Sequence, residues 1–263
     1  MDLGIRGKVA LVCAASKGLG RATAHALAAE GCKVAICGRD KATLEATARE
    51  LSELTGGHVM AIPADVSQPE QVEALLTMVA LELGPIDILV HNAGGPPPGG
   101  LDAVDEAQWA AGIELGLMSL IRMVKVVSPG MIERKWGRIV SIASTTVQQP
   151  KEDLLVSSTV RAGVAAFLKA LSGRLAKDNV TVHTVCPGPT RTNRMIDLAG
   201  RIAGQKGITP EEAEAGLTAD VPMGRMGRPE EVGDFVAMLC SDRLGFSTGL
   251  TVAVDGGQVK ALI

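Results

Sequence analysis

The fold is decided by the stretch Val9-Ala10-Leu11-Val12-Cys13-Ala14-Ala15-Ser16-Lys17-Gly18-Leu19-Gly20. It begins with a continuous apolar run, which predicts a strand buried on both faces of a parallel sheet. Two glycines follow in a turn, and a segment of helical character runs from about Leu19 to Glu30. Glycines between a strand and a helix let the backbone approach a phosphate, whose charge is stabilised by the amide N–H groups at the helix start. The stretch therefore predicts the first strand, turn and helix of a dinucleotide-binding α/β fold.

The rest of the chain repeats this alternation of strand and helix. Apolar runs of strand length are separated by amphipathic segments of helical length, which is typical of a doubly wound parallel sheet with helices on both faces. We expect one Rossmann-fold domain over residues 1–263, with ligands at the carboxyl ends of the strands. The seven expected strands are residues 9–14, 34–37, 59–62, 86–90, 138–142, 180–185 and 250–254.

The composition argues against several classes of protein. Lysine and arginine total 26 against 29 aspartates and glutamates, and no basic stripe is present, so we expect no nucleic-acid partner. The start of the sequence lacks a basic segment followed by an apolar one, and charges, Gly or Pro interrupt the apolar runs. We therefore expect a cytoplasmic protein without a membrane partner. The five cysteines form no Cys-x-x-Cys pair and no metal-ligand spacing, which predicts small buried side chains and no metal site.

Two segments depart from the strand and helix alternation. Residues 94–100, Gly-Gly-Pro-Pro-Pro-Gly-Gly, follow a strand and predict a loop, which is either a pocket wall or a plain connector. Residues 192–228, just after Pro187-Gly188-Pro189, are expected to be irregular and to form a lid over the substrate.

The end of the second strand indicates the type of cofactor. An arginine there can pair with a 2′-phosphate, whereas an acidic residue would hold a ribose diol. Arg39, helped by Lys17, therefore favours NADP(H) over NAD(H). Asp40 is the rival signal for NAD, but it is better explained as the N-cap of the helix that begins at Lys41.

Further motifs stand in the order and spacing of one known family. They are Asp65-Val66, His91-Asn92-Ala93-Gly94, residues 137–144, Pro187-Gly188 and Asp255-Gly256-Gly257. Together with residues 9–20 they cover nearly the whole chain, and the pattern resembles the short-chain dehydrogenases/reductases, especially the β-ketoacyl carrier-protein reductases. The sequence departs from that family at Ala14, a glycine there, and at His91, an asparagine there. We expect the Ala14 methyl group to weaken cofactor binding without abolishing it.

The resemblance implies where the cofactor lies. Asp65 would face the adenine, residues 92–94 would line the nucleotide cleft, and Pro187, Gly188 and Thr192 would lie near the nicotinamide. With the residues of the glycine turn, the expected cofactor-binding residues are Ala14, Ser16, Lys17, Gly18, Leu19, Gly20, Arg39, Asp65, Val66, Asn92, Ala93, Gly94, Arg161, Pro187, Gly188 and Thr192.

Most of the family's catalytic residues are replaced. Members that reduce carbonyls use an Asn, a Ser, a Tyr as general acid and a Lys that lowers the pKa of the Tyr. Ser144 matches the Ser, but the Tyr, Lys and Asn positions are Ser157, Arg161 and Gly116, and the chain has no tyrosine at all. A serine hydroxyl ends about 4 Å short of a phenol oxygen by ordinary bond lengths, and it is too weak an acid at neutral pH. Arg161 cannot act as a proton reservoir, but it can still donate to ribose hydroxyls or to an anionic substrate.

Several further interpretations follow from these replacements. The Ser-x-x-x-Arg pair beside a Gly-Gly-Pro-Pro-Pro loop also resembles a divergent subgroup of reductase-like proteins, from which no mechanism follows. Halohydrin dehalogenases carry the Arg too, but they keep the Tyr and lack the glycine loop, so that resemblance is weaker. The available substitute acids are His91, Glu152 and Asp153, of which His91 is better explained as a core residue and the other two as a solvated loop. Gly116 and Gly112 predict close helix packing at a subunit interface.

Two functions remain open at this point. The family resemblance favours an NADP(H)-dependent oxidoreductase that acts on a carbonyl or alcohol group of a small molecule. The chemistry of the replaced residues favours a nucleotide-binding pseudoenzyme, such as a non-catalytic subunit or sensor. In either case the resemblance implies a homotetramer built on the two long helices that contain Gly116 and Ser157.

Overall fold

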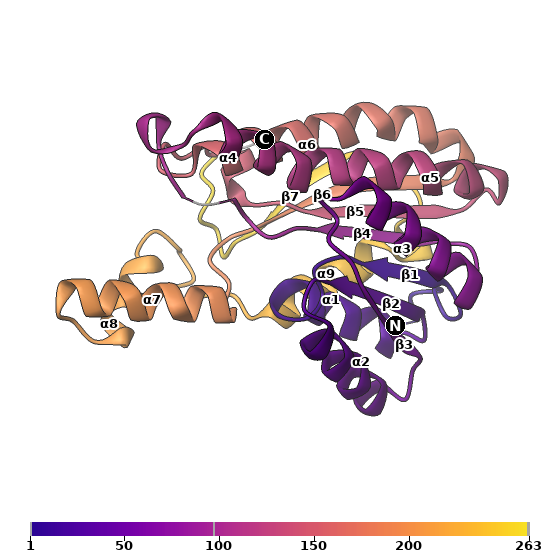
Figure 1. The fold of residues 1–263 in the computed structure, drawn as a ribbon, viewed down its shortest axis with the longest axis horizontal. Coiled ribbons are helices and arrows are strands. Elements are labelled where there is room, and N and C mark those ends of the chain that lie inside the picture. The colour runs from indigo at the N-terminus through magenta and orange to yellow at the C-terminus, as the bar shows by residue number, and fades with distance from the viewer. Residues whose placement is uncertain (1, 97, 262–263) are drawn as a thin grey trace.

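The expected strands form one parallel sheet. In the computed structural model, which describes residues 2–96 and 98–261, seven strands follow the order β3-β2-β1-β4-β5-β6-β7 (Figure 1). Val12 pairs with Ile36 on one side and with Val90 on the other, so β1, β2 and β4 end at the same edge. The chain reverses direction across the sheet between β1 and β4, which is where ligands of such sheets bind. The strands are β1 (Val9–Val12), β2 (Lys33–Gly38), β3 (Val59–Pro63), β4 (Ile88–Asn92), β5 (Gly137–Ile142), β6 (Val180–Pro187) and β7 (Leu250–Val254).

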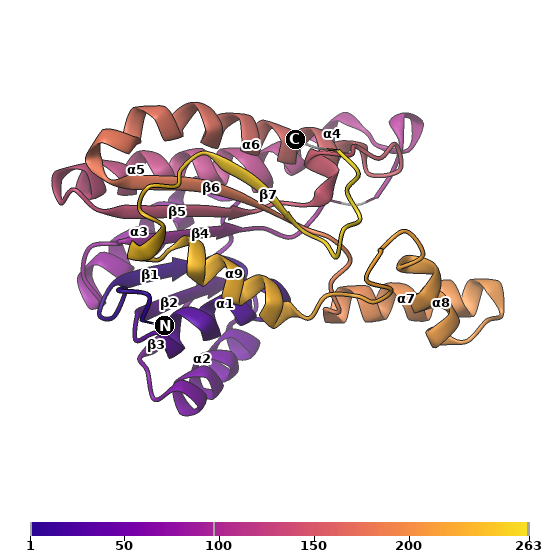
Figure 2. The same ribbon diagram turned by 180° about the vertical axis from the view of Figure 1, so that it is seen from behind.

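Helices cover both faces of the sheet, as the doubly wound, single-domain Rossmann prediction requires. One face is covered by α1 (Gly18–Ala29), α2 (Lys41–Thr55) and α9 (Pro229–Leu239), and Figure 2 shows α1 beside α9. The other face is covered by α3 (Pro69–Glu82), α4 (Glu106–Ile113), α5 (Ser119–Glu133) and α6 (Leu155–Leu175). Between these layers β1, β5 and β6 are fully buried and supply much of the core. The sequence of β1 is continuously apolar, as such burial favours, whereas β5 and β6 also bury polar side chains such as Arg138 and His183. Short helical turns lie at Leu101–Ala103, Glu114–Met118, Thr145–Val147, Ala176–Asp178 and Asp242–Leu244.

The segment 192–228 was expected to be irregular, which was wrong for most of residues 193–217 and holds for residues 218–228. It contains two helices, α7 (Asn193–Lys206) and α8 (Pro210–Leu217), which extend away from the sheet (Figure 1). Gly207, with φ 65°, ends α7, and Thr209 and Glu212 form a reciprocal capping box that starts α8. The two helices bury a small cluster of their own, made by Ala199, Ala203 and Ala213.

The glycine- and proline-rich loop runs beside the start of α6. The Gly99 N–H donates to the Asp153 carbonyl at 2.8 Å, and the Leu155 N–H donates back to the Gly99 carbonyl at 3.3 Å. Pro97 lies outside the described residues. The loop is therefore held against the part of α6 that carries Ser157.

One apolar helix, which Arg161, Gly163 and Lys169 interrupt, bears on the expectation that the apolar runs are broken short of a membrane span. Residues Leu155–Asp178 are long and apolar enough to cross a membrane by length and composition. This segment packs on β6 and covers the sheet, so it is a core helix. All five cysteines are free and buried, as their spacing predicted.

Candidate active site

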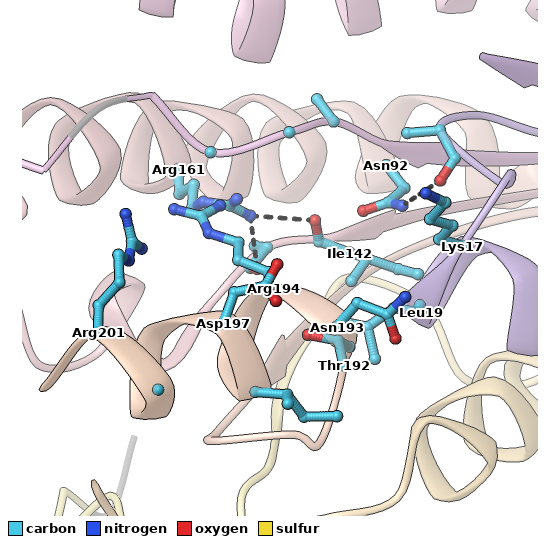
Figure 3. Close-up of a pocket in the computed structure, with 18 residues that line it drawn as sticks. Lys17, Leu19, Asn92, Ile142, Arg161, Thr192, Asn193, Arg194, Asp197 and Arg201 are labelled. Atoms are coloured by element: carbon cyan, nitrogen blue, oxygen red, sulfur yellow. Dashed lines mark hydrogen bonds between the residues drawn. The ribbon is translucent and has the colours of Figure 1, made fainter. Parts of the chain in front are cut away.

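A cleft of about 1190 Å³ opens at the carboxyl edge of the sheet (Figure 3). The turn after β1, the end of β4, the middle of α6 and the start of α7 form its walls. The structure thus brings together segments that are far apart in the sequence. Nine of the residues predicted to bind the cofactor line it: Ala14, Lys17, Gly18, Leu19, Asn92, Ala93, Gly94, Arg161 and Thr192.

The turn after β1 has the backbone that the glycine motif predicted. Gly18 has φ 59°, and a Cβ atom on Gly20 would lie 2.5 Å from the Ala14 carbonyl oxygen, so only glycine lets α1 approach the turn. Ala14 itself has φ 47°, in the left-handed region. An L-residue with a side chain loses roughly 1–2 kcal/mol there. Ala14 therefore holds a backbone conformation that suits glycine, at a cost in strain.

The ends of β2 and β3 bring Arg39 and Asp65 close together. Asp40 accepts a hydrogen bond from the Thr43 N–H at 2.7 Å, so its carboxylate caps α2 as predicted. Asp65 accepts from the Ser67 N–H at 3.0 Å and from the Ser67 hydroxyl at 2.8 Å. Burial opposes ionisation of Asp65, but these hydrogen bonds and the charge of Arg39 lower its pKa overall. Arg39 remains exposed and is the cation at this end.

The other predicted binding residues lie around the cleft and not in its lining. Ser16 lines a smaller pocket next to it, together with Lys17 and Gly18. Val66 is buried. Pro187 ends β6, and a Cβ atom on Gly188 would lie 2.8 Å from the Asp255 Cα atom, so Gly188 lets two chain segments meet closely.

Arg161 is fixed by three hydrogen bonds. Its Nη1 donates to the carbonyls of Ile142 at 3.3 Å and Ala143 at 2.5 Å, and its Nε donates to the Ser157 hydroxyl at 3.1 Å. Burial, and then the nearby Arg194, lower the pKa of Arg161 to about 10. The guanidinium therefore keeps its charge at neutral pH, and the Ser157 hydroxyl accepts one of its hydrogen bonds.

Ser144 stands apart from this pair. Its hydroxyl accepts from the Thr146 N–H at 3.2 Å and caps the short helix Thr145–Val147. Among the described residues, no hydrogen bond joins Ser144 to Ser157 or Arg161. Of the three predicted catalytic residues, the structure therefore couples two.

A small cavity of about 20 Å³ lies behind Ser157, where α4 and the π-helical segment Glu114–Met118 meet α6. Gly112 and Gly116 line it. A Cβ atom on Gly116 would lie 2.6 Å from Val160 Cγ1, and one on Gly112 would lie 2.5 Å from Val156 Cγ1. These glycines therefore let α4 and the π-helical segment pack closely on α6 within one chain, and their expected place at a subunit interface stays a prediction.

None of the substitute acids is placed for proton transfer. His91 also lines the small cavity, but its Nδ1 lies 3.1 Å from Ser141 Oγ and its Nε2 lies 2.9 Å from Ser119 Oγ. Burial, and then Arg161, lower the pKa of His91 to about 3, so the ring is neutral at physiological pH. Glu152 and Asp153 are exposed and line neither the cleft nor the cavity. The prediction of a satisfied core histidine and a solvated acidic loop is confirmed.

Sequence reasoning missed the side chains that α7 contributes. Arg194, Asp197 and Arg201 all line the cleft (Figure 3). Their spacing of three and four residues places them on one face of a helix. The signal was present in the sequence, but it is visible only once residues 193–206 are recognised as a helix. Among the described residues, no cluster of His, Cys, Asp and Glu is arranged to hold a metal ion.

Comparisons with known proteins agree with this geometry. The family model described as enoyl-(acyl carrier protein) reductase matches residues 13–258. Nodulation protein G of Azospirillum brasilense is 36% identical over 250 residues, covering 95% of this chain and 97% of its own. The 3-oxoacyl-[acyl-carrier-protein] reductase FabG of Escherichia coli (strain K12) is 33% identical over 256 residues, covering 97% and 99%. Among solved structures, L-sorbose reductase from Gluconobacter frateurii, in complex with NADPH and L-sorbose, is 33% identical, with a TM-score of 0.96 and full coverage of both chains.

Proposed function

Since the chain belongs to the short-chain dehydrogenase/reductase family, we propose that it is an NADP(H)-dependent oxidoreductase whose proton-transfer machinery is degenerate. At the level of the family it is an oxidoreductase that uses NAD(P) on CH–OH or C=O groups. The observation that carries the proposal is the glycine turn after β1, which opens onto the same cleft as Arg161 and Thr192. A dinucleotide bound at the turn therefore extends toward the residues at the catalytic positions.

The residues present fit such a cofactor. The Cβ-free Gly18, the start of α1 and the amine of Lys17 offer donors and positive charge to a pyrophosphate. A Cβ atom on Gly94 would meet nothing within 4 Å, so the wall after β4 is open. Arg39 would pair with a 2′-phosphate, and Asp65 and Val66 would lie beside the adenine. Structural relatives in complex with NADPH support the choice of NADP(H).

The mechanism depends on positioning. When bound, the nicotinamide supplies or accepts the hydride. Arg161, rigid because of its bonds to Ile142 and Ala143, would stand where cofactor and substrate meet. Ser144 would present a hydroxyl to the substrate oxygen. The Ser157 hydroxyl accepts a hydrogen bond from Arg161 and keeps its own proton, but a serine hydroxyl is too weak an acid to deliver that proton at an ordinary rate at neutral pH.

A second candidate function is that of a nucleotide-binding pseudoenzyme, and one observation favours it. The family's tyrosine and asparagine positions are Ser157 and Gly116, and a Cβ atom on Gly116 would already lie 2.6 Å from Val160 Cγ1, so an asparagine would not fit beside α6 as it stands. Restoring the phenol alone would therefore not restore the family's site. A non-catalytic subunit or sensor would keep the cleft and use binding alone.

One experiment distinguishes an oxidoreductase from a pseudoenzyme. Purified protein is titrated with NADPH and NADH while cofactor fluorescence is followed, and the complex is then supplied with a panel of ketones. NADPH binding with turnover well below the usual ~1–1000 per second supports an impaired oxidoreductase. Turnover within that range would show that the missing phenol has been misjudged, and binding without any turnover would favour the pseudoenzyme.

Membership of this family also supports proposals about the substrate, the location and the assembly of the protein. We infer a small-molecule substrate, a cytoplasmic location, and a homotetramer formed through the face of α4, α5 and α6. The pair α7–α8 would act as the lid, because it carries cleft residues on a unit that extends from the sheet.

A further inference from the structure

Three arginines converge on one end of the cleft. Arg161 comes from α6, while Arg194 and Arg201 come from one face of α7 (Figure 3). A Cβ atom on Gly95 would lie 2.6 Å from Arg194 Nη1, so this guanidinium reaches across to the loop after β4. Arg194 is also near enough to Arg161 to lower its pKa. The cleft thus concentrates positive charge from two separate elements.

These arginines lack the ion pairs that their neighbours form. Arg191 pairs with Glu214 at 3.0 Å, and Arg225 pairs with Glu231 at 2.8 Å. Among the described residues, Arg161, Arg194 and Arg201 form no ion pair with any carboxylate. The cleft is lined by these three and Lys17 as cations and by Asp197 as its acid.

Like charges held close together in a partly closed cleft raise the free energy of the protein unless an anion binds between them. Arg161 is not free to move away, because Ile142, Ala143 and Ser157 hold it. Its Nη2 donates to no group among the described residues, and Arg161 lines the same cleft as Arg194. Guanidinium groups present paired donors that match the two oxygens of a carboxylate, and a partly buried site strengthens such bonds.

We propose that the substrate carries a carboxylate, which binds between Arg161 and Arg194 with Arg201 at the rim. The proposal rests on the proposed function and names the substrate class for that site. It also gives α7 a role, because closure of the lid over a bound acid would be favoured by its own arginines.

The cofactor's phosphates are the other source of an anion for these arginines. The turn of Lys17 and Gly18 offers the phosphates their own site, and Figure 3 shows Arg161 and Arg201 at the opposite end of the cleft from Lys17. This separation between Lys17 and the arginines favours a substrate group over the pyrophosphate as the anion that the arginines bind. The experiment must still distinguish the two.

The test uses matched acids and esters with the whole protein. Acetoacetate and 4-oxopentanoate, each beside its methyl ester, are titrated calorimetrically into protein saturated with NADP⁺. We expect at least one acid to bind about 10-fold or more tightly than its ester, as loss of a charge-assisted hydrogen bond implies. Arg194→Gln should remove most of that preference and Arg201→Gln a smaller part. Arg49→Gln, which alters an exposed arginine on α2 outside the cleft, should leave the preference intact.

Each other outcome has a defined meaning. Equal binding of acid and ester in both pairs by wild-type protein that binds NADP⁺ would overturn the proposal while leaving the proposed function in place. An Arg194→Gln variant that folds, weakens NADPH binding about 10-fold and keeps the acid preference would assign the arginine to the cofactor, and would also overturn it. A wild-type protein that binds neither NADPH nor NADP⁺ would instead refute the proposed function. Thermal melting of each variant checks that it is folded.

Discussion

The proposed preference for a 2′-phosphate depends mainly on one exposed side chain, Arg39. Replacing Arg39 by Asp removes the cation and places an acid that can hold a ribose diol. We expect the ratio of NADPH to NADH affinity to fall at least 10-fold, as loss of a charge-assisted hydrogen bond of about 1.5–3 kcal/mol implies. The ratio is measured by fluorescence titration with both cofactors.

The control for this prediction is the neighbouring Asp40. Asp40→Asn removes its negative charge but keeps an oxygen that can cap α2. The cofactor ratio should therefore stay as in the wild type. An unchanged ratio in Arg39→Asp would contradict the assignment of Arg39.

Replacing Ala14, a second residue, by glycine is expected to stabilise the protein. Ala14→Gly relieves the left-handed backbone at φ 47°, while the added freedom of glycine in the unfolded chain offsets part of the gain. We expect the free energy of unfolding to rise by up to about 1 kcal/mol in urea denaturation. Ala15→Gly is the matched control, because Ala15 is fully buried and not at positive φ, and it should destabilise by about 1 kcal/mol. A loss of stability in both variants would show that the strain at Ala14 is relieved elsewhere.

At the scale of elements, the contact between the π-helical segment and α6 decides whether catalysis can be restored. Gly116→Asn, Ser157→Tyr and Arg161→Lys together recreate the family's relay, phenol and ammonium beside Ser144. The Asn side chain, however, meets Val160, because even a Cβ atom would lie 2.6 Å from its Cγ1. The triple variant is therefore expected to lose about 1–3 kcal/mol through overpacking. Adding Val160→Ala should relieve the overlap.

The fourfold variant should gain activity on generic ketones. General acid catalysis contributes ~10²–10⁴-fold, so NADPH oxidation should rise by that order over the wild type. Ser157→Tyr alone should recover much less, because catalytic groups that act together are not additive. The matched control carries Phe in place of the new Tyr, which keeps the ring and lacks the hydroxyl. Equal activity of the Tyr and Phe versions, both folded and binding NADPH, would mean that the substrate position is lost as well.

The elements also show what the sequence could and could not reveal. The strands were predictable because parallel strands buried on both faces are continuously apolar, and Asp40 could be assigned as a cap from local chemistry alone. The helix α7 was missed although apolar residues recur in it at helical spacing, at positions 195, 198, 199, 202 and 203, because the whole segment after Pro187-Gly188-Pro189 was interpreted as irregular. The arginines of α7 were missed with it, since their meeting with Arg161 depends on how the two helices are placed. The packing of Gly116 could not be predicted for a related reason, because only coordinates show that its neighbour within the chain is Val160.

At the scale of the whole molecule, the predicted homotetramer can be tested on α5. Val126 lies on this helix and is 58% exposed. Val126→Glu should convert a tetramer into smaller species at micromolar concentration, as measured by light scattering, because a carboxylate would be buried at the interface. Leu54→Glu on α2, where Leu54 is 63% exposed, should leave the tetramer intact. A monomeric wild type at the same concentration would refute the assembly.

The contact between Gly116 and Val160 also bears on how this protein could change over generations. Restoring the asparagine first introduces a steric overlap, and restoring the tyrosine first yields a phenol without its relay or its lysine. Trimming Val160 first removes buried side-chain volume, since Val160 is 5% exposed, and returns nothing until the other changes arrive. Each single step toward the family's residues is therefore expected to restore little activity. The packing of Gly116 against Val160 makes recovery of the family's chemistry depend on several changes made together.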